Sequence, residues 1–110
     1  MKFPVVRFSF LPASGMAIFP FVFVKYAKLK YNKQIVNHEL IHLRQQIELL
    51  IIPFFILYIF NYLINILRYK NHDQAYRNIV FELEAYGNDS NFRYLKDRRF
   101  CSWIKYIRSY

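Results

Sequence analysis

The sequence predicts a mainly helical α+β fold: an N-terminal β-hairpin, three main helices and a short C-terminal helical segment. Two runs rich in Phe and Val near the N-terminus predict the hairpin. Apolar residues that recur every three or four positions further along the chain predict the helices. At 110 residues the chain has the usual size of one domain. We therefore expect a single domain over residues 1–110.

The predicted hairpin pairs residues 3–11 with residues 17–25 around a turn at 12–15, where Pro, Ala, Ser and Gly follow one another. Pro20 lies in the second run and lacks a backbone N–H, so this run should be an edge or bulged strand. Residues 1–16 lack the apolar stretch of a signal peptide, so we expect no cleavage.

The first predicted helix covers residues 33–51, and Pro53 should interrupt it. A second helix over residues 49–67 carries no formal charge and has a borderline length for a membrane span. It also has a polar seam of Tyr58, Asn61, Asn65 and Arg68. A third helix over 71–87 should begin at the cap residue Asn71 and end at Gly87. Residues 89–110, rich in basic and aromatic side chains, resemble an interfacial tail.

The composition excludes several classes of protein. Hydrophobic residues make up 55% of the chain and there are two glycines, which excludes a disordered or a loop-rich protein. Cys101 is the one cysteine of the sequence, so neither an internal disulfide nor a cysteine-based metal cluster can form. Any metal must be held by histidines and carboxylates.

The charge indicates a polyanionic partner. Sixteen Lys and Arg face seven Asp and Glu, a formal net charge of +9, which suits nucleic acid or an acidic membrane surface. Twelve Phe and ten Tyr beside these basic residues favour the membrane surface. Nucleic acid is less favoured because a continuous apolar run such as residues 49–57 has no use in binding phosphates.

One motif carries chemistry. His38, Glu39 and His42 form the pattern H-E-x-x-H inside the first predicted helix. On a helix, histidines four residues apart lie on one face and can bind one Zn²⁺, while the adjacent Glu39 can reach a metal-bound water. With the few His and Glu present, the pattern would arise by chance with a probability of roughly 0.003.

A catalytic zinc needs a third protein ligand. Glu48 has metzincin spacing, but that pattern requires Gly at position 45, where this chain has Gln, and Glu48 would lie about 15 Å along the helix from His38. His72 fits the polar start of a helix better. On a helical wheel of the third helix, Glu82 borders the apolar face and Glu84 joins the polar arc. We therefore predict Glu82 as the third ligand and Glu84 as an ordinary surface residue, whose change to Gln costs under about 0.5 kcal/mol.

His38-Glu-x-x-His42, followed by Glu82-x-x-Ala85, resembles the gluzincin arrangement of membrane-associated zinc peptidases, including the CAAX-processing, heat-shock and sensor types. The chain is more similar still to a group of small bacterial H-E-x-x-H proteins that share the segments 37–48, 75–78 and 81–86. This resemblance implies zinc bound by His38, His42 and Glu82, with Glu39 as base. Tyr86 stands where the larger peptidases have Asp.

The ligand set also constrains the topology. If residues 49–67 crossed a bilayer once, His42 and Glu82 would emerge on opposite sides of roughly 30 Å of hydrocarbon and could not share an ion. The chain must therefore turn near Pro53, and the apolar helix should lie in the core or against one leaflet.

Together these features predict a zinc-dependent, metallopeptidase-like hydrolase in which Glu39 activates water for attack on a peptide carbonyl. We expect a bacterial protein in the cytoplasm or at the membrane, with a peptide or protein substrate that could align on the edge strand. Tyr86, Tyr76, His72 and Arg77 are unranked candidates to stabilise the oxyanion, and Gln45 lies on the face of the two histidines. The alternative function is a non-catalytic, basic membrane-surface protein.

Overall fold

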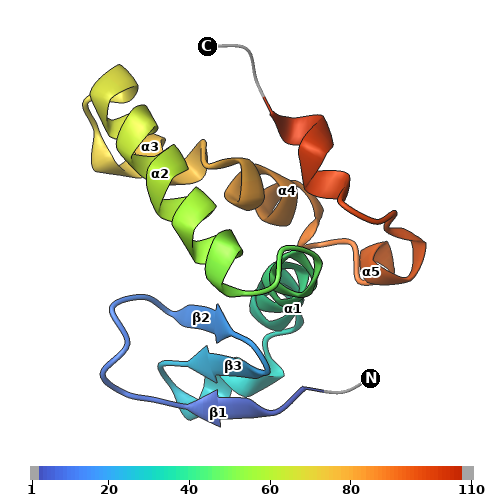
Figure 1. Ribbon diagram of the computed structural model, residues 1–110. Helices are drawn as coiled ribbons and strands as arrows, with labels where there is room; N and C mark the ends of the chain where they lie inside the picture. Colours follow the sequence, from blue (N-terminus) through green and yellow to red (C-terminus); the bar gives the residue numbers. More distant parts are fainter. Residues whose placement is uncertain (1–2, 108–110) are drawn as a thin grey trace.

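The computed structural model describes residues 3–107 and has a mixed α+β fold in which a small sheet is followed by helices (Figure 1). In chain order the elements are β1 (Val5–Arg7), β2 (Gly15–Ile18), β3 (Phe21–Val24), the 3₁₀ helix η1 (Ala27–Tyr31), α1 (Lys33–Glu48), α2 (Ile52–Tyr69), α3 (His72–Arg77), α4 (Val80–Asn88), α5 (Tyr94–Asp97) and the 3₁₀ helix η2 (Ser102–Tyr106). The predicted α+β, mainly helical class is confirmed.

The sheet has the order β1-β3-β2, with β2 antiparallel and β1 parallel to the central strand β3. Residues 3–11 do pair with the run 17–25, but in parallel, through β1 and β3, so the predicted hairpin between the two runs is wrong. The hairpin lies within the second run, between β2 and β3. Pro20 is in the turn of that hairpin, because a residue without an N–H cannot continue the ladder. The strand after Pro20 is consequently central, while β2 is at an edge.

Asn32 caps the start of α1: its side-chain oxygen accepts hydrogen bonds from the backbone N–H groups of Gln34 and Ile35, both at 3.1 Å. It ends at Glu48, where Leu50 and Ile51 take positive φ angles of 61° and 60° and reverse the chain. Pro53 then stands in the first turn of α2, a position that needs no N–H. The predicted break near Pro53 is confirmed.

The predicted third helix is two helices. Its cap Asn71 is confirmed, since the side chain accepts a hydrogen bond from Gln74 N at 3.0 Å. The helix stops at Arg77, and Ile79 is extended (φ −62°, ψ 133°) before α4 begins. α4 continues past Gly87 to Asn88, so the predicted cap at Gly87 is wrong. The break allows α3 to pack on α2 while α4 packs on α1.

Two apolar clusters hold the site between them. Ala17, Val22, Val24 and Leu43 form the first cluster, between the sheet and α1. Phe54, Ile79 and Phe81 form the second, between α2 and α4, and Trp103 of the C-terminal segment packs against it. Within the predicted interfacial tail, Trp103 is therefore partly buried against the core, whereas Phe100 is 78% exposed. Residues 108–110 of the predicted tail lie outside the described part of the chain.

Candidate metal centre

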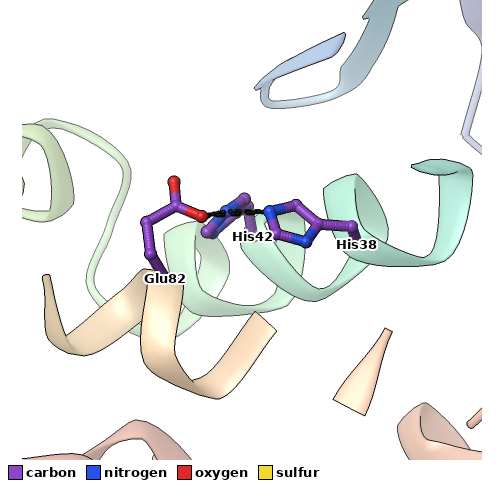
Figure 2. A group of neighbouring side chains, drawn as sticks. All are labelled: His38, His42 and Glu82. Atoms are coloured by element: carbon purple, nitrogen blue, oxygen red, sulfur yellow. Dashed lines mark hydrogen bonds and ion pairs between the residues drawn. The ribbon is translucent and has the colours of Figure 1, made fainter. Parts of the chain in front are cut away.

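His38, His42 and Glu82 meet at one point between α1 and α4 (Figure 2). The two histidines are four residues apart in α1, so both lie on the face of this helix that α4 covers. The Nε2 atoms of His38 and His42 lie 3.0 and 3.1 Å from Glu82 Oε1 and 3.2 Å from each other. All three residues are buried. The structure thus brings together the three residues that the sequence predicted as metal ligands.

The remaining ring nitrogens are held by acceptors. His38 Nδ1 lies 3.0 Å from Asp89 Oδ2, and His42 Nδ1 lies 2.8 Å from Gln45 Oε1. The amide of Gln45 cannot be reversed, because its Nε2 donates to the acceptors Phe81 O and Glu84 Oε1. When the two imidazoles are neutral, as metal ligands must be, these contacts place the ring proton on Nδ1 and leave the Nε2 lone pair directed at Glu82.

The donor atoms have the dimensions of a zinc site. Three such atoms within 3.2 Å of one another repel unless a proton on a histidine Nε2 or a metal cation lies among them, so a metal would take the place of that proton. In a tetrahedral site with Zn–N and Zn–O bonds of about 2.0–2.1 Å, neighbouring donors are about 3.3 Å apart. Two imidazoles and one carboxylate are a known zinc ligand set that leaves the fourth position open. The residues present therefore fit a catalytic type of zinc centre.

The electrostatics of the cluster favour positive charge at this point. Burial alone lowers the pKa of His42, but the adjacent Glu82 carboxylate outweighs burial and raises it to about 9. Burial raises the pKa of Glu82, yet the two histidines outweigh it and hold this pKa well below its usual value. Glu82 is therefore an anion, the form in which a carboxylate binds a metal.

Glu39 borders the open side of the cluster. With His38 it lines a cleft of about 670 Å³, and with His42 and Glu82 it lines a second hollow of about 210 Å³. Strand β2 passes so close that a Cβ atom on Gly15 would lie 3.0 Å from Glu39 Oε2, which explains a glycine at this position. Burial raises the pKa of Glu39, against the opposing effect of His42 and His38. A carboxyl of raised pKa is suited to accept and return a proton.

Tyrosines surround the cluster. Tyr58 of α2 donates a 2.6 Å hydrogen bond to Glu82 Oε2, which leaves Oε1 to face the histidines. Tyr86 packs edge-on against His38 and donates to the Tyr76 hydroxyl at 3.2 Å. Tyr76 lines both hollows together with Glu39. Burial and then the charge of Glu82 raise the pKa of Tyr76, so its hydroxyl stays protonated.

The other predicted candidates do not converge on the cluster. His72 lines the larger cleft but is exposed, with its Nδ1 2.8 Å from the Tyr62 hydroxyl. Arg77 is exposed and pairs with Asp73. Glu48 lies at the far end of α1, where it forms an ion pair with Arg98 at 2.6 Å. It is therefore not a metal ligand, as we predicted.

The prediction for Glu84 is wrong. Glu84 is fully buried and accepts hydrogen bonds from Gln45, Tyr94 and Arg98. The helical wheel placed it correctly away from Glu82, but the C-terminal segment folds over that side and covers it with Arg98 and Tyr94. An isolated helix contains no information about this later segment.

Sequence reasoning missed Asp89, which orients His38 and accepts a hydrogen bond from Gln34 Nε2 at 2.9 Å. No spacing rule links a residue just after one helix to a histidine on another. Tyr58 was visible in the polar seam of the apolar helix, and Gln45 on the histidine face, although neither was assigned a partner. Gln45 proves to contact the predicted ligand His42.

Comparisons of the chain with protein-family models, with curated proteins and with solved structures found no match.

Proposed function

We propose that the protein is a zinc-dependent, metallopeptidase-like hydrolase. The observation that carries the proposal is the convergence of two histidine Nε2 atoms and one carboxylate oxygen, spaced like zinc ligands, beside the buried carboxyl group of Glu39. The ligands would be His38, His42 and Glu82. The substrate would be a peptide or a protein segment that enters the cleft next to Glu39.

A zinc ion bound there supplies Lewis acidity, which makes water easier to deprotonate and a carbonyl easier to attack. Glu39 takes the proton of the attacking water and passes it to the leaving amine. Its position supports this role, because it lines both the cleft and the hollow above the histidines. Its raised pKa supports the return of the proton.

Tyr76 is the best placed of the four candidates to stabilise the oxyanion. It lines both hollows with Glu39, and it accepts the hydrogen bond from Tyr86, so its own proton is available to another acceptor. A hydrogen-bond donor aimed at developing negative charge lowers the barrier of acyl transfer. Tyr86 then acts as a positioning residue for Tyr76 and His38.

The substrate chain would align along β2. This strand is at the edge of the sheet and lines the hollow beside Glu39. The Gln46 side chain bonds Ala17 O at 2.8 Å and Phe19 N at 2.7 Å, so pairing would use the part of the strand around Gly15. An extended peptide can add to such an edge through backbone hydrogen bonds.

The alternative, a non-catalytic and basic membrane-surface protein, uses none of these features. It offers no reason to bury two histidines and three carboxylates in one place, and burial of such groups is costly unless they are paired or bound to a metal. The hydrolase is therefore the function that the site supports best.

The test separates metal binding from chemistry. The zinc-loaded protein is incubated with a mixture of proteome-derived peptides, and new termini are counted by mass spectrometry. Glu39→Gln leaves the three proposed ligands intact, so its zinc content should stay unchanged while peptide cleavage falls by at least about 10²-fold. Asp73→Asn is a control for the loss of an exposed carboxylate that does not line the cleft.

Two results contradict the proposal. Zinc-loaded wild-type protein that cleaves no peptide of the mixture argues against a peptidase. Equal cleavage by wild type and Glu39→Gln removes Glu39 from the mechanism.

A further inference from the structure

The polarity of α2 is the reverse of that of a helix in a soluble protein. Taken at about 100° per residue, its polar seam and its exposed apolar residues occupy opposite halves of the helix. The seam residues Tyr58, Asn61 and Asn65 face the protein, where they bond Glu82, Val80 N and Ala75 O. The half that faces outward is apolar.

This outer face runs along nearly the whole of α2, which lies at the periphery of the molecule (Figure 1). Leu67 is 78% exposed and Phe60 62%. The exposed apolar residues of the face are Ile52, Ile56, Leu57, Ile59, Phe60, Leu63, Ile64 and Leu67. By length and composition α2 is the one helix among residues 3–107 that could cross a membrane, and 11% of it is buried. A continuous apolar surface along a whole helix indicates a binding site for a protein or a membrane.

The charge of the protein indicates which partner covers this surface. Five of the seven acidic residues have side chains at most 9% exposed: Glu39, Glu48, Glu82, Glu84 and Asp89. Among the described Lys and Arg residues, Arg98 is the one that is buried. The surface is consequently more positive than the net charge of +9 suggests. Two copies of such a surface repel each other, whereas an anionic bilayer attracts it.

The orientation of α2 follows from α3. α3 packs along the C-terminal half of α2, where Asn65 bonds Ala75 O and Tyr62 contacts His72. On this helix His72, Asp73, Gln74 and Arg77 are all exposed. If α2 stood across a bilayer, these polar side chains would lie within the hydrocarbon, at a high cost in free energy. A helix lying flat keeps them in water.

We propose that α2 docks flat on an anionic lipid bilayer, with its outer face in the boundary between headgroups and acyl chains. Arg68 and Lys70, at the C-terminal end of the helix, would lie at headgroup level. This surface is opposite to the seam that contacts Glu82, so docking leaves the candidate metal centre uncovered. The proposal does not depend on the hydrolase function.

Flotation with vesicles tests the docking. Wild-type protein should float with vesicles of phosphatidylcholine and phosphatidylglycerol in a ratio of about 7:3. The double change Ile56→Ser and Phe60→Ser should lower the partition coefficient at least tenfold. Tyr31→Ser removes an aromatic residue outside α2 that is more exposed still (85%) and should leave binding unchanged. Circular dichroism verifies that the variants are folded.

Spin labels test the orientation. In a Cys101→Ser background, nitroxides are attached at Ile52→Cys, Phe60→Cys and Leu67→Cys, whose outer positions extend about 22 Å along the helix. Equal and shallow depths at the three positions support a flat helix. A label at position 60 that is much deeper than the other two indicates a spanning helix and overturns the flat orientation.

Other outcomes overturn the docking itself. Wild-type protein that stays out of the vesicle fraction, or a double variant that floats as well as wild type, contradicts the proposal. So does a wild-type dimer in light scattering that the double variant converts to a monomer without any binding to vesicles, because the face would then cover a second copy of the chain.

Discussion

The side chains that hold the histidines explain why the donor atoms converge. Asp89 accepts from His38 Nδ1 and from Gln34, while Gln45 accepts from His42 Nδ1. Each contact fixes the tautomer of a ring and its rotation. The candidate metal centre therefore depends on Asp89 and Gln45 as well as on its three donors.

The role of Asp89 can be measured in isolation. Asp89→Asn replaces the carboxylate by a neutral amide of nearly equal size, so the ring of His38 is held less firmly in the orientation that a metal ligand needs. We expect the affinity for zinc, measured by competition with a chelating dye, to fall about 10–100-fold. Asp73→Asn, an exposed aspartate on α3, is the matched control and should leave the affinity unchanged. Equal affinities for Asp89→Asn and wild type would show that Asp89 does not orient a ligand.

At this scale the sequence predicted the residues that repeat with a helical period and missed those that do not. His38, His42 and Glu39 were found because one short pattern fixes their geometry. Glu82 was found because it borders the apolar side, with Ala75, Ile79 and Leu83, of the predicted third helix, although the structure divides that helix at Ile79. Asp89 and the partners of Glu84 depend on how the chain returns after α4, which no local pattern encodes.

At the scale of elements, α4 begins without a cap of its own. Its N-cap residue is Ile79, which has no side-chain acceptor, and the hydrogen bond to Val80 N at 2.9 Å comes instead from Asn61 Oδ1 of α2. An apolar helix thus supplies the polar group that starts the helix of the third ligand. Such a bond fixes α4, and with it Glu82, relative to α2.

Removal of this cap should destabilise the fold. Asn61→Leu leaves Val80 N without an acceptor, and we expect the free energy of unfolding in urea to fall by about 1–2 kcal/mol. Asn78→Ala removes an asparagine whose amide donates to Gln74 O at the surface, and it should cost under about 0.5 kcal/mol. Similar losses in the two variants would mean that the contact between α2 and α4 contributes nothing beyond an ordinary surface bond.

The predicted elements failed where the chain turns. The run 17–25 divides at Pro20, which cannot donate to the ladder, and its halves pair with each other as β2 and β3. The helix 71–87 divides at Ile79, because α3 packs on α2 and α4 packs on α1. Tertiary packing, which decides where a periodic segment bends, is absent from a local pattern.

On the scale of the whole molecule, a buried ionic network joins the C-terminal segment to the site. Arg98 binds both Glu84 and Glu48, and Glu84 also accepts from Gln45, the partner of His42. Glu48 Oε2 additionally accepts from Cys101 N at 2.8 Å. Loss of one member of such a network leaves a buried charge unpaired.

This network predicts a dependence of stability on pH. Burial raises the pKa of Glu84, but hydrogen bonds from Arg98 and Tyr94 outweigh burial and lower it below its ordinary value of 4.5. The ionised form therefore stabilises the fold above about pH 4.5, and this contribution is lost as the pH falls through the lowered pKa. Glu84→Gln should cost about 3 kcal/mol at pH 7.

The free energies of unfolding of wild type and Glu84→Gln, measured in urea on the zinc-free proteins, should differ less below pH 4 than at pH 7. Asp97→Asn, at an exposed position, should have the same free energy of unfolding as wild type at either pH. A gap for Glu84→Gln that is the same at pH 7 and at pH 3 would contradict a charged Glu84 in the native state.

The content of zinc tests the central claim most directly. Protein purified without chelator and analysed by plasma mass spectrometry should hold about one zinc per chain, while His42→Ala and Glu82→Gln should each retain under about a tenth of it. Glu84→Gln changes a carboxylate near the site but no proposed ligand, so the folded fraction of this variant should still bind zinc. A folded wild-type protein that takes up no zinc from an equimolar solution would contradict the account.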